Sequence, residues 1–215
     1  MKIQISFYNK LVIFCGALLF FRFLITSHYS FLFLFWNLFL AWLPLFLIRK
    51  VAGNYSKLKK TILLGLSILF LPNAPYILTD LFHLKKSLLA PLWLDLILIL
   101  SFAFLGLFYF IMSFELILSE INRRFGKKVS VFFKPLLLCA TAYGIYLGRY
   151  MRFNSWDIIS DPIGLAKGVG ISVFDKDYYK ETFAVTITFT VFLYLVFEIY
   201  LSFRNKVILK EDELH

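Results

Sequence analysis

Long apolar runs constrain the fold of this chain more than any other feature of its sequence. Of its 215 residues, 60% are hydrophobic and 20% are aromatic, and the mean hydropathy is +0.79. A water-soluble domain of this length could not bury so much apolar surface, so lipid must solvate much of the chain. A helix needs about 20 residues to cross a bilayer. The runs therefore predict an all-α fold, a polytopic membrane bundle of about six transmembrane helices.

The apolar runs fill the sequence, which predicts a single integral membrane domain over residues 1–215. The third run is short and stops at Pro72, because proline interrupts a helix. We expect its broken continuation over 73–84 to form a short re-entrant or interfacial helix. The predicted spans lie at about 8–27, 30–48, 60–71, 92–118, 131–150 and 181–203.

Basic residues in the loops predict which side of the membrane each loop faces. Fifteen of the 23 Lys and Arg residues fall at the two termini and in loops 49–60 and 119–134, while seven fall in the alternate loops. Lys and Arg are enriched in cytoplasmic loops. We therefore expect both termini to be cytoplasmic. Glu198, near the inner end of the sixth span, is expected either to extend its carboxylate to the membrane surface or to pair with the cytoplasmic basic residues.

The net charge of +10 is explained by this orientation and does not point to nucleic acid. Neither a phosphate-binding glycine loop nor an RNA-binding signature accompanies the basic residues in the sequence. The lipid bilayer is the partner that the composition predicts directly.

The stretch PNAPYILTDLFH (72–83) interrupts the third run and, by this orientation, lies at the outer face of the membrane. Asn73 suits an N-cap, and a proline in the first turn after it is tolerated. An interrupted backbone at membrane depth needs protein or water around it. On an α-helix, one face of this stretch would carry four polar residues, namely Asn73, Tyr76, Asp80 and His83.

Asp80 and His83 are the candidate catalytic residues. The imidazole could act as a general base that the carboxylate orients. At this spacing the two side chains could also bind one metal ion, or simply hydrogen-bond to each other. The sequence leaves these alternatives open, and it leaves the metal requirement and every other cofactor unknown.

Further polar residues lie at the outer ends of other segments, and Arg22 lies toward the outer end of the first span. Arginine could bind the phosphate of a lipid head group or of a lipid-linked sugar. The loop at 151–180, about 30 residues long, begins on this side. With Asn73 and Tyr76, the candidate substrate-binding residues are Asn37, Asp95, Arg149, Arg152, Asn154, Trp156 and Asp157.

Plainer roles exist for several of these residues. Asn73 could act only as a helix cap, and Asp157 could cap the turn that begins at Asn154. Arg149 and Arg152 could contact lipid phosphates without forming a site. If a site exists, we expect Asp80 and His83 to face these two arginines.

The chain resembles a family of uncharacterised prokaryotic membrane proteins, domain-of-unknown-function family 1361. The resemblance rests on WNLFLAWLP (36–44), LPNAPYILTDLFHL (71–84), the segment 93–95 and LGRYMRFNSWDI (147–158). It covers essentially the whole chain. It implies a compact multi-span protein of a prokaryotic plasma membrane, and it implies no particular chemistry.

Three functions remain open at this stage. The first is a protein that acts on or binds an envelope lipid or a lipid-linked phosphate at the outer face, as an enzyme or without catalysis. The second is a small-solute transporter, since broken helices near polar residues are common in transporters. The third is a non-catalytic binding or assembly partner that docks an envelope protein through loop 151–180.

Overall fold

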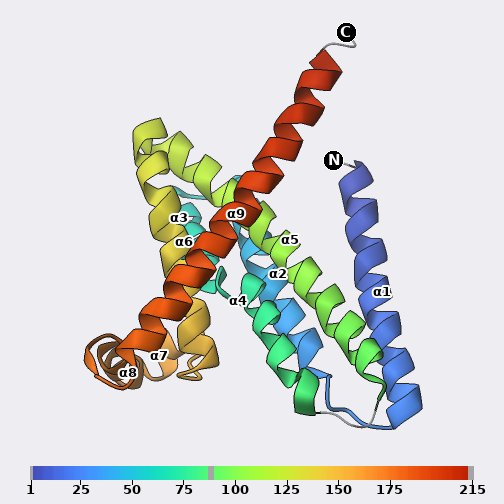
Figure 1. Cartoon of the computed structure of the whole chain (residues 1–215). Helices are drawn as coiled ribbons and strands as arrows, with labels where there is room; N and C mark the ends of the chain where they lie inside the picture. The colour runs from blue at the N-terminus through green and yellow to red at the C-terminus, as the bar shows by residue number, and fades with distance from the viewer. Residues whose placement is uncertain (1, 87–89, 213–215) are drawn as a thin grey trace. The chain divides into compact units, whose positions relative to one another are not determined.

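The computed structural model of the chain describes residues 2–86 and 90–212, and the regular structure in these residues is helical (Figure 1). Six of the described segments are long and apolar enough to cross a membrane. They confirm the predicted all-α bundle and make the chain a multi-pass membrane protein. The candidate spans are Asn9–Thr26, Phe33–Val51, Lys57–Leu84, Leu92–Phe125, Lys127–Arg149 and Tyr179–Lys206.

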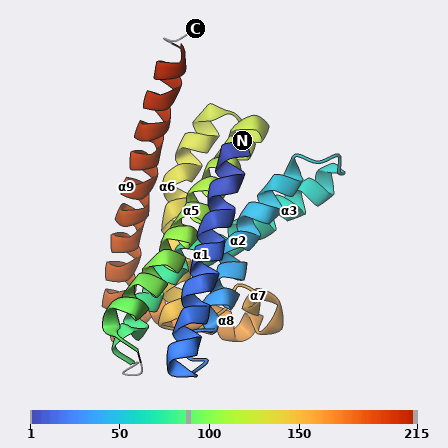
Figure 2. The same cartoon turned by 90° about the vertical axis from the view of Figure 1, so that its right-hand side faces the viewer.

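The chain divides into two compact units, Met1–Ile117 and Leu118–His215, which are described separately. Unit 1 contains the first part of α5 and five shorter helical elements. The hydroxyl of Ser67 in α3 donates to the carbonyl of Pro44 in α2 over 2.8 Å, and Figure 2 shows these two helices side by side as a hairpin. The elements are α1 (Lys2–Thr26), α2 (Phe33–Val51), α3 (Lys57–Phe70), α4 (Asn73–Tyr76), the 3-10 helix η1 (Ile77–Lys86) and α5 (Leu92–Phe125).

Two prolines change the hydrogen bonds of the third span. Proline has no N–H, so Pro72 and Pro75 leave two carbonyls without the donor that an α-helix would supply. Each carbonyl accepts instead from the residue before the proline. The N–H of Leu71 donates to Ile68 over 3.2 Å, and the N–H of Ala74 donates to Leu71 over 3.2 Å. In each of these bonds the donor lies three residues after the acceptor, which is the pattern of a 3-10 helix and tighter than that of an α-helix.

The chain nevertheless keeps a helical course through this region. The dihedral angles of Leu71, Pro72 and Ile77 all lie in the right-handed helical region. The α-helix ends near the predicted break, at Phe70, whereas the candidate span continues to Leu84. The third span is thus longer than the predicted 60–71, and it includes the segment that we expected to be re-entrant or interfacial.

Close backbone packing holds this segment within unit 1. A Cβ atom placed on Gly106 of α5 would lie 2.5 Å from the carbonyl oxygen of Ala74 and 3.1 Å from Cδ1 of Ile77. A side chain at this position would therefore collide with backbone that cannot move freely. The absence of a side chain at residue 106 lets α5 approach the start of η1.

Unit 2 contains the end of α5 and four further helices, of which α6 and α9 pack against each other. An ion pair joins Lys134 of α6 to Glu198 of α9, which confirms that Glu198 pairs with a basic residue. The ammonium group of Lys134 also lies 5.2 Å from the ring centroid of Tyr194. The helices are α6 (Lys127–Arg149), α7 (Asp157–Ser160), α8 (Pro162–Phe174) and α9 (Tyr179–Asp212).

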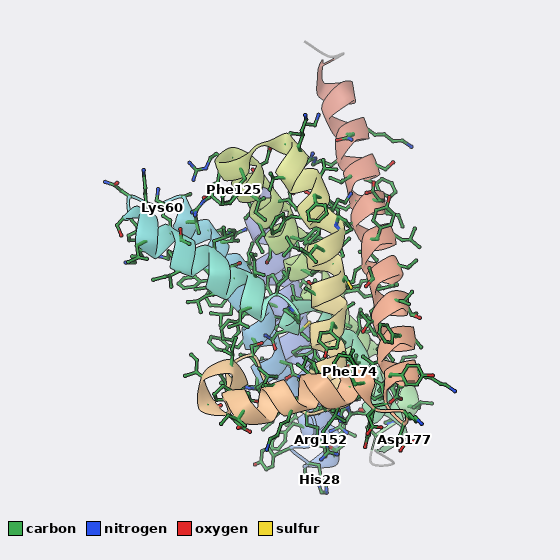
Figure 3. The ribbon with its side chains drawn as sticks, turned by 90° about the vertical axis from the view of Figure 1, so that its left-hand side faces the viewer. His28, Lys60, Phe125, Arg152, Phe174 and Asp177 are labelled. Atoms are coloured by element: carbon green, nitrogen blue, oxygen red, sulfur yellow. The ribbon has the colours of Figure 1, made fainter. Side chains whose placement is uncertain are left out.

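The predicted loop at 151–180 differs from the structure, because much of it is helical. Asp161 caps α8 by accepting a hydrogen bond from the N–H of Gly164 over 2.9 Å, and Pro162 occupies the first turn. Both features are established signals for a helix start. Figure 3 shows α8 running across the direction of α6 and α9.

Candidate functional site

A buried ion pair joins the first and fourth candidate spans in unit 1. Nε of Arg22 lies 2.6 Å from one carboxylate oxygen of Asp95, and its Nη2 lies 3.4 Å from the other. Both side chains are about 1% exposed. A pair so well shielded from solvent interacts more strongly than a surface pair, and loss of either partner leaves an uncompensated charge. In Figure 1, α1 and α5 approach each other toward the end of the unit that holds this pair.

Aromatic rings continue this cluster from Arg22 toward η1. The guanidinium carbon of Arg22 lies 4.1 Å from the ring centroid of Phe31. That ring stacks on Phe33 at 5.9 Å, and Phe33 lies 5.1 Å from the imidazole of His83. Arginine and aromatic faces attract each other electrostatically. These contacts connect Asp95 to His83 through one continuous series of side chains.

Asn37 and Asp80, both predicted as site residues, are hydrogen-bonded to each other. Nδ2 of Asn37 donates to a carboxylate oxygen of Asp80 over 2.8 Å. Asp80 is 1% exposed, whereas Asn37 is half-buried. A buried carboxylate requires hydrogen-bond donors to be stable. The amide of Asn37 supplies one, and it thereby links α2 to η1.

The 3-10 geometry of η1 determines how Asp80 and His83 are aligned. In an α-helix these two residues would be offset around the axis, but three residues complete a full turn of a 3-10 helix. Their side chains therefore leave the same side of η1. His83 is half-buried, and the role of the two residues in catalysis or metal binding stays a prediction.

Asn73 and Tyr76 lie in the single turn of α4. The predicted N-cap role of Asn73 is wrong, because α4 has no side-chain cap. The Asn73 amide instead donates to the carbonyl of Phe70 over 2.9 Å, a carbonyl at the end of α3. The backbone carbonyl of Tyr76 accepts from the hydroxyl of Thr79 over 2.7 Å. Both residues therefore stabilise the junction between helical segments.

The end of α6 presents two arginines in unit 2. Arg149 is the last residue of α6 and is half-buried, and Arg152 is exposed. Arg152 has φ of +60°, a left-handed conformation that helices commonly adopt at their end with glycine. The N–H of Phe153 then donates to the carbonyl of Leu147 over 3.1 Å, which folds the chain back on the last turn. Arginine in this conformation is uncommon.

Asp157 stabilises its own turn, as the plainer alternative for it proposed. One carboxylate oxygen accepts from the N–H of Asn154 over 2.6 Å, and the other accepts from the hydroxyl of Ser160 over 3.0 Å. Asn154 is exposed, and Trp156 in the same turn is 37% exposed. The carboxylate of Asp157 is therefore used within the segment that follows the arginines.

Three tyrosines stack next to the arginines, two in α6 and one directly after it. The rings of Tyr146 and Tyr150 lie 5.0 Å apart and nearly parallel, and Tyr143 lies 6.5 Å from Tyr146. Burial raises the pKa of Tyr150, the residue after α6, and the carboxylate of Glu181 raises it further. A tyrosine hydroxyl is protonated at neutral pH without any shift, so Tyr150 can donate a hydrogen bond there.

The structure thus describes the predicted residues in two groups. Within unit 1, Asn37 is hydrogen-bonded to Asp80, and Asp95 is connected through Arg22 and the aromatic rings to His83. The pairing of Arg22 with Asp95 was not predicted from the sequence. The signal was present, since Arg22 and Asp95 carry opposite charges at the same predicted depth. Arg149, Arg152, Asn154, Trp156 and Asp157 belong to unit 2. Whether Asp80 and His83 face Arg149 and Arg152 concerns both units and stays a prediction.

No curated protein and no solved structure was found to match this chain. A family model does match it, over residues 36–196. The matched region begins just before Asn37 and includes η1 and the segment after α6. Because this match covers most of the chain, the protein belongs to the DUF1361 family, described as proteins of unknown function.

Proposed function

We propose that this membrane protein binds an anionic head group, that of an envelope lipid or a lipid-linked phosphate, at the end of unit 2 where α6 stops. The observation that carries the proposal is Arg152, an exposed arginine in a left-handed backbone conformation. Such a conformation costs on the order of 1 kcal/mol for a residue with a side chain. A glycine would avoid this cost. We therefore infer that the guanidinium group of Arg152 has a function that offsets it.

The surroundings of Arg152 suit a phosphate. In the described part of the chain, its guanidinium has no ion-pair partner, and Asp157 uses both oxygens within its own turn. A guanidinium can donate two parallel hydrogen bonds to one phosphate. Trp156 and Tyr150 are of the types enriched where a membrane meets water. We place this end at the outer face because the basic loops lie on the other side of the predicted topology.

The arginine of unit 1 is less suited to this role. Arg22 is buried and already bound by the carboxylate of Asp95 at 2.6 Å. Two opposite charges in contact present little net charge to a ligand. We therefore assign Arg22 to the stability of unit 1, and head-group binding to the end of α6.

A second candidate function is chemistry on a bound lipid, and one arrangement favours it. Asp80 is buried, held by Asn37 at 2.8 Å, and aligned with His83 on one side of η1. A carboxylate in that position could orient an imidazole that accepts a proton from an attacking hydroxyl or water. Replacing Asp80 by Asn keeps the size of the side chain. An unchanged lipid profile in cells that carry only this variant would contradict the catalytic role.

Binding can be tested with purified full-length protein in nanodiscs. The probes are a phosphatidylglycerol, which carries a phosphodiester, and a polyprenyl phosphate, which carries a phosphomonoester. We expect Arg152→Gln to weaken binding of the preferred probe about tenfold, equivalent to ~1.4 kcal/mol. Arg152→Lys should restore part of it, because lysine keeps the charge without the planar fork.

Lys167→Gln is the matched control, since Lys167 is an exposed cation in the same unit. It should change affinity by less than about twofold if binding depends on the arginine rather than on total charge. If Arg152→Gln and Lys167→Gln lowered the affinity equally, binding would depend only on unspecific charge attraction. That result would overturn the proposal. The preferred probe then distinguishes a bulk phospholipid from a lipid-linked phosphate.

A further inference from the structure

Helix α8 is apolar but too short to cross a membrane. It contains 13 residues, which gives a length of about 20 Å against a hydrocarbon core of about 30 Å. Lys167 is the one charged residue between Pro162 and Phe174. A helix of this composition must contact either protein or lipid over most of its surface.

One face of α8 is fixed to its own unit. The ring of Phe153 covers Gly168 so closely that a Cβ atom there would collide with Cε2 of the ring. The hydroxyl of Ser172, which is fully buried, lies 2.8 Å from the hydroxyl of Tyr143 in α6. These contacts set the rotation of α8 about its axis.

The opposite face of α8 carries large apolar side chains that are exposed in the structure. Ile163 is 69% exposed, Ile171 is 45% exposed and Phe174 is 85% exposed. Their spacing of eight and then three residues places them along one side of a helix. Ile159, in the preceding α7, is 81% exposed. A side chain of this kind loses the favourable free energy of burial when it faces water.

The connection to α9 places this face close to the membrane. Only Asp175–Tyr178 separate Phe174 from the first residue of α9, which is a candidate span. Figure 3 shows Phe174 and Asp177 at the same end of α9, with Arg152 at that end of the unit and Phe125 at the other. Near the start of that span, Phe183 is also exposed, at 50%.

We propose that α8 lies in the interfacial layer of the bilayer, with Ile163, Ile171 and Phe174 in contact with lipid acyl chains. The occupant of the exposed face is lipid, because the face adjoins a span and is apolar apart from Lys167. This lysine lies on the same face between Ile163 and Ile171, and its long side chain can carry the ammonium group to the head groups. An interfacial helix of this kind buries its apolar side a few ångströms into the head-group boundary. This inference does not depend on head-group binding by Arg152, and it concerns a different set of residues.

Depth can be measured by spin labelling of full-length protein in nanodiscs. In a background with Cys15→Ala and Cys139→Ala, single cysteines are introduced at Ile163, Ile171 and Phe174, with Asp177→Cys as the matched control. Asp177 is exposed and lies in the linker. The measured quantity is the ratio of the collision rate with oxygen, which concentrates in lipid, to that with a water-soluble nickel complex. We expect this ratio to be at least about fivefold higher for labels on α8 than for the label at Asp177.

Two outcomes would overturn the proposal. Labels on α8 that are as accessible to nickel as Asp177 would place the face in water, and labels shielded from both reagents would mean that protein covers it. If the cysteine-free background does not fold, Phe174→Trp and Asp177→Trp provide a second measurement. Brominated lipids should quench the added fluorescence of the first variant and leave that of the second unchanged.

Discussion

The two groups of polar residues in this protein differ in whether their charges are buried and paired or exposed. In unit 1, Arg22 and Asp95 are about 1% exposed and neutralise each other, and Asp80 is held by Asn37. In unit 2, Arg152 is exposed, and the nearby carboxylate of Asp157 binds its own turn. Buried and paired charge contributes to the structure, whereas exposed charge is available to a ligand. The difference separates a stabilising function from a binding function within one chain.

The largest effect is expected when the buried pair is broken. Arg22→Ala leaves Asp95 charged and buried, which should lower the free energy of unfolding by about 3–5 kcal/mol. Thermal unfolding in detergent would measure this loss. The double variant Arg22→Asp with Asp95→Arg should recover part of it, because the pair is restored in reverse. If Arg152→Ala were equally destabilising, the proposed contrast between the two units would not hold.

A smaller loss is expected from a side chain at the close contact of α5 with α4. Gly106→Ala would place its Cβ 2.5 Å from the carbonyl oxygen of Ala74, and overpacking of this kind costs about 1–3 kcal/mol. Gly65→Ala is the matched control, since a Cβ there meets nothing within 4 Å. It should be neutral or stabilise α3 by up to about 1 kcal/mol. Denaturation of both variants measures the difference, and a loss at Gly65→Ala as large as that at Gly106→Ala would contradict the prediction.

The hydrogen bond between Asn37 and Asp80 should also matter for stability. Asn37→Ala removes one donor from a buried carboxylate, at a cost of about 1–3 kcal/mol. Asn154→Ala at the exposed end of α6 removes a comparable amide and should cost less than about 0.5 kcal/mol. Unfolding curves for the two variants would measure the loss of stability caused by each. Equal costs would indicate that the exposed turn is as important for stability as the buried pair.

The smallest expected effect is a gain in stability. Arg152→Gly relieves the positive φ of +60° and should raise the free energy of unfolding by up to about 1 kcal/mol. The same change should reduce head-group binding as Arg152→Gln does. A variant that is more stable and binds less would show that the strained conformation serves the ligand. A destabilised variant would indicate instead that the arginine supports the fold.

The sequence predicts six long apolar spans, because hydrocarbon thickness sets the length of the apolar run that each span needs. It also predicts that the helix changes at Pro72, since a missing N–H has a local consequence. It does not predict η1, because the choice between 3-10 and α hydrogen bonds depends on packing against Gly106 and on the second proline. The apolar residues of α8 lie among three glycines and between Asp161 and Asp175, and their helical pattern is weak for that reason.

Local sequence patterns could not predict which polar side chains of unit 1 bond to each other. Arg22 and Asp95 are 73 residues apart in sequence, and Asn37 and Asp80 are 43 apart. Such contacts depend on how helices pack and not on spacing within one helix. Asp157, by contrast, bonds to Asn154 three residues away, and its role as a local cap follows from the sequence.

The 3-10 geometry of η1 makes the third span longer than an α-helix of the same residues would be. Ten residues extend about 20 Å as a 3-10 helix and about 15 Å as an α-helix. A change between the two would also turn His83 by about 60° relative to Asp80, because one repeat completes a turn in three residues and the other in 3.6. A bilayer a few ångströms thinner would favour the shorter form. We therefore expect the angle between these two side chains to differ between bilayers of different thickness.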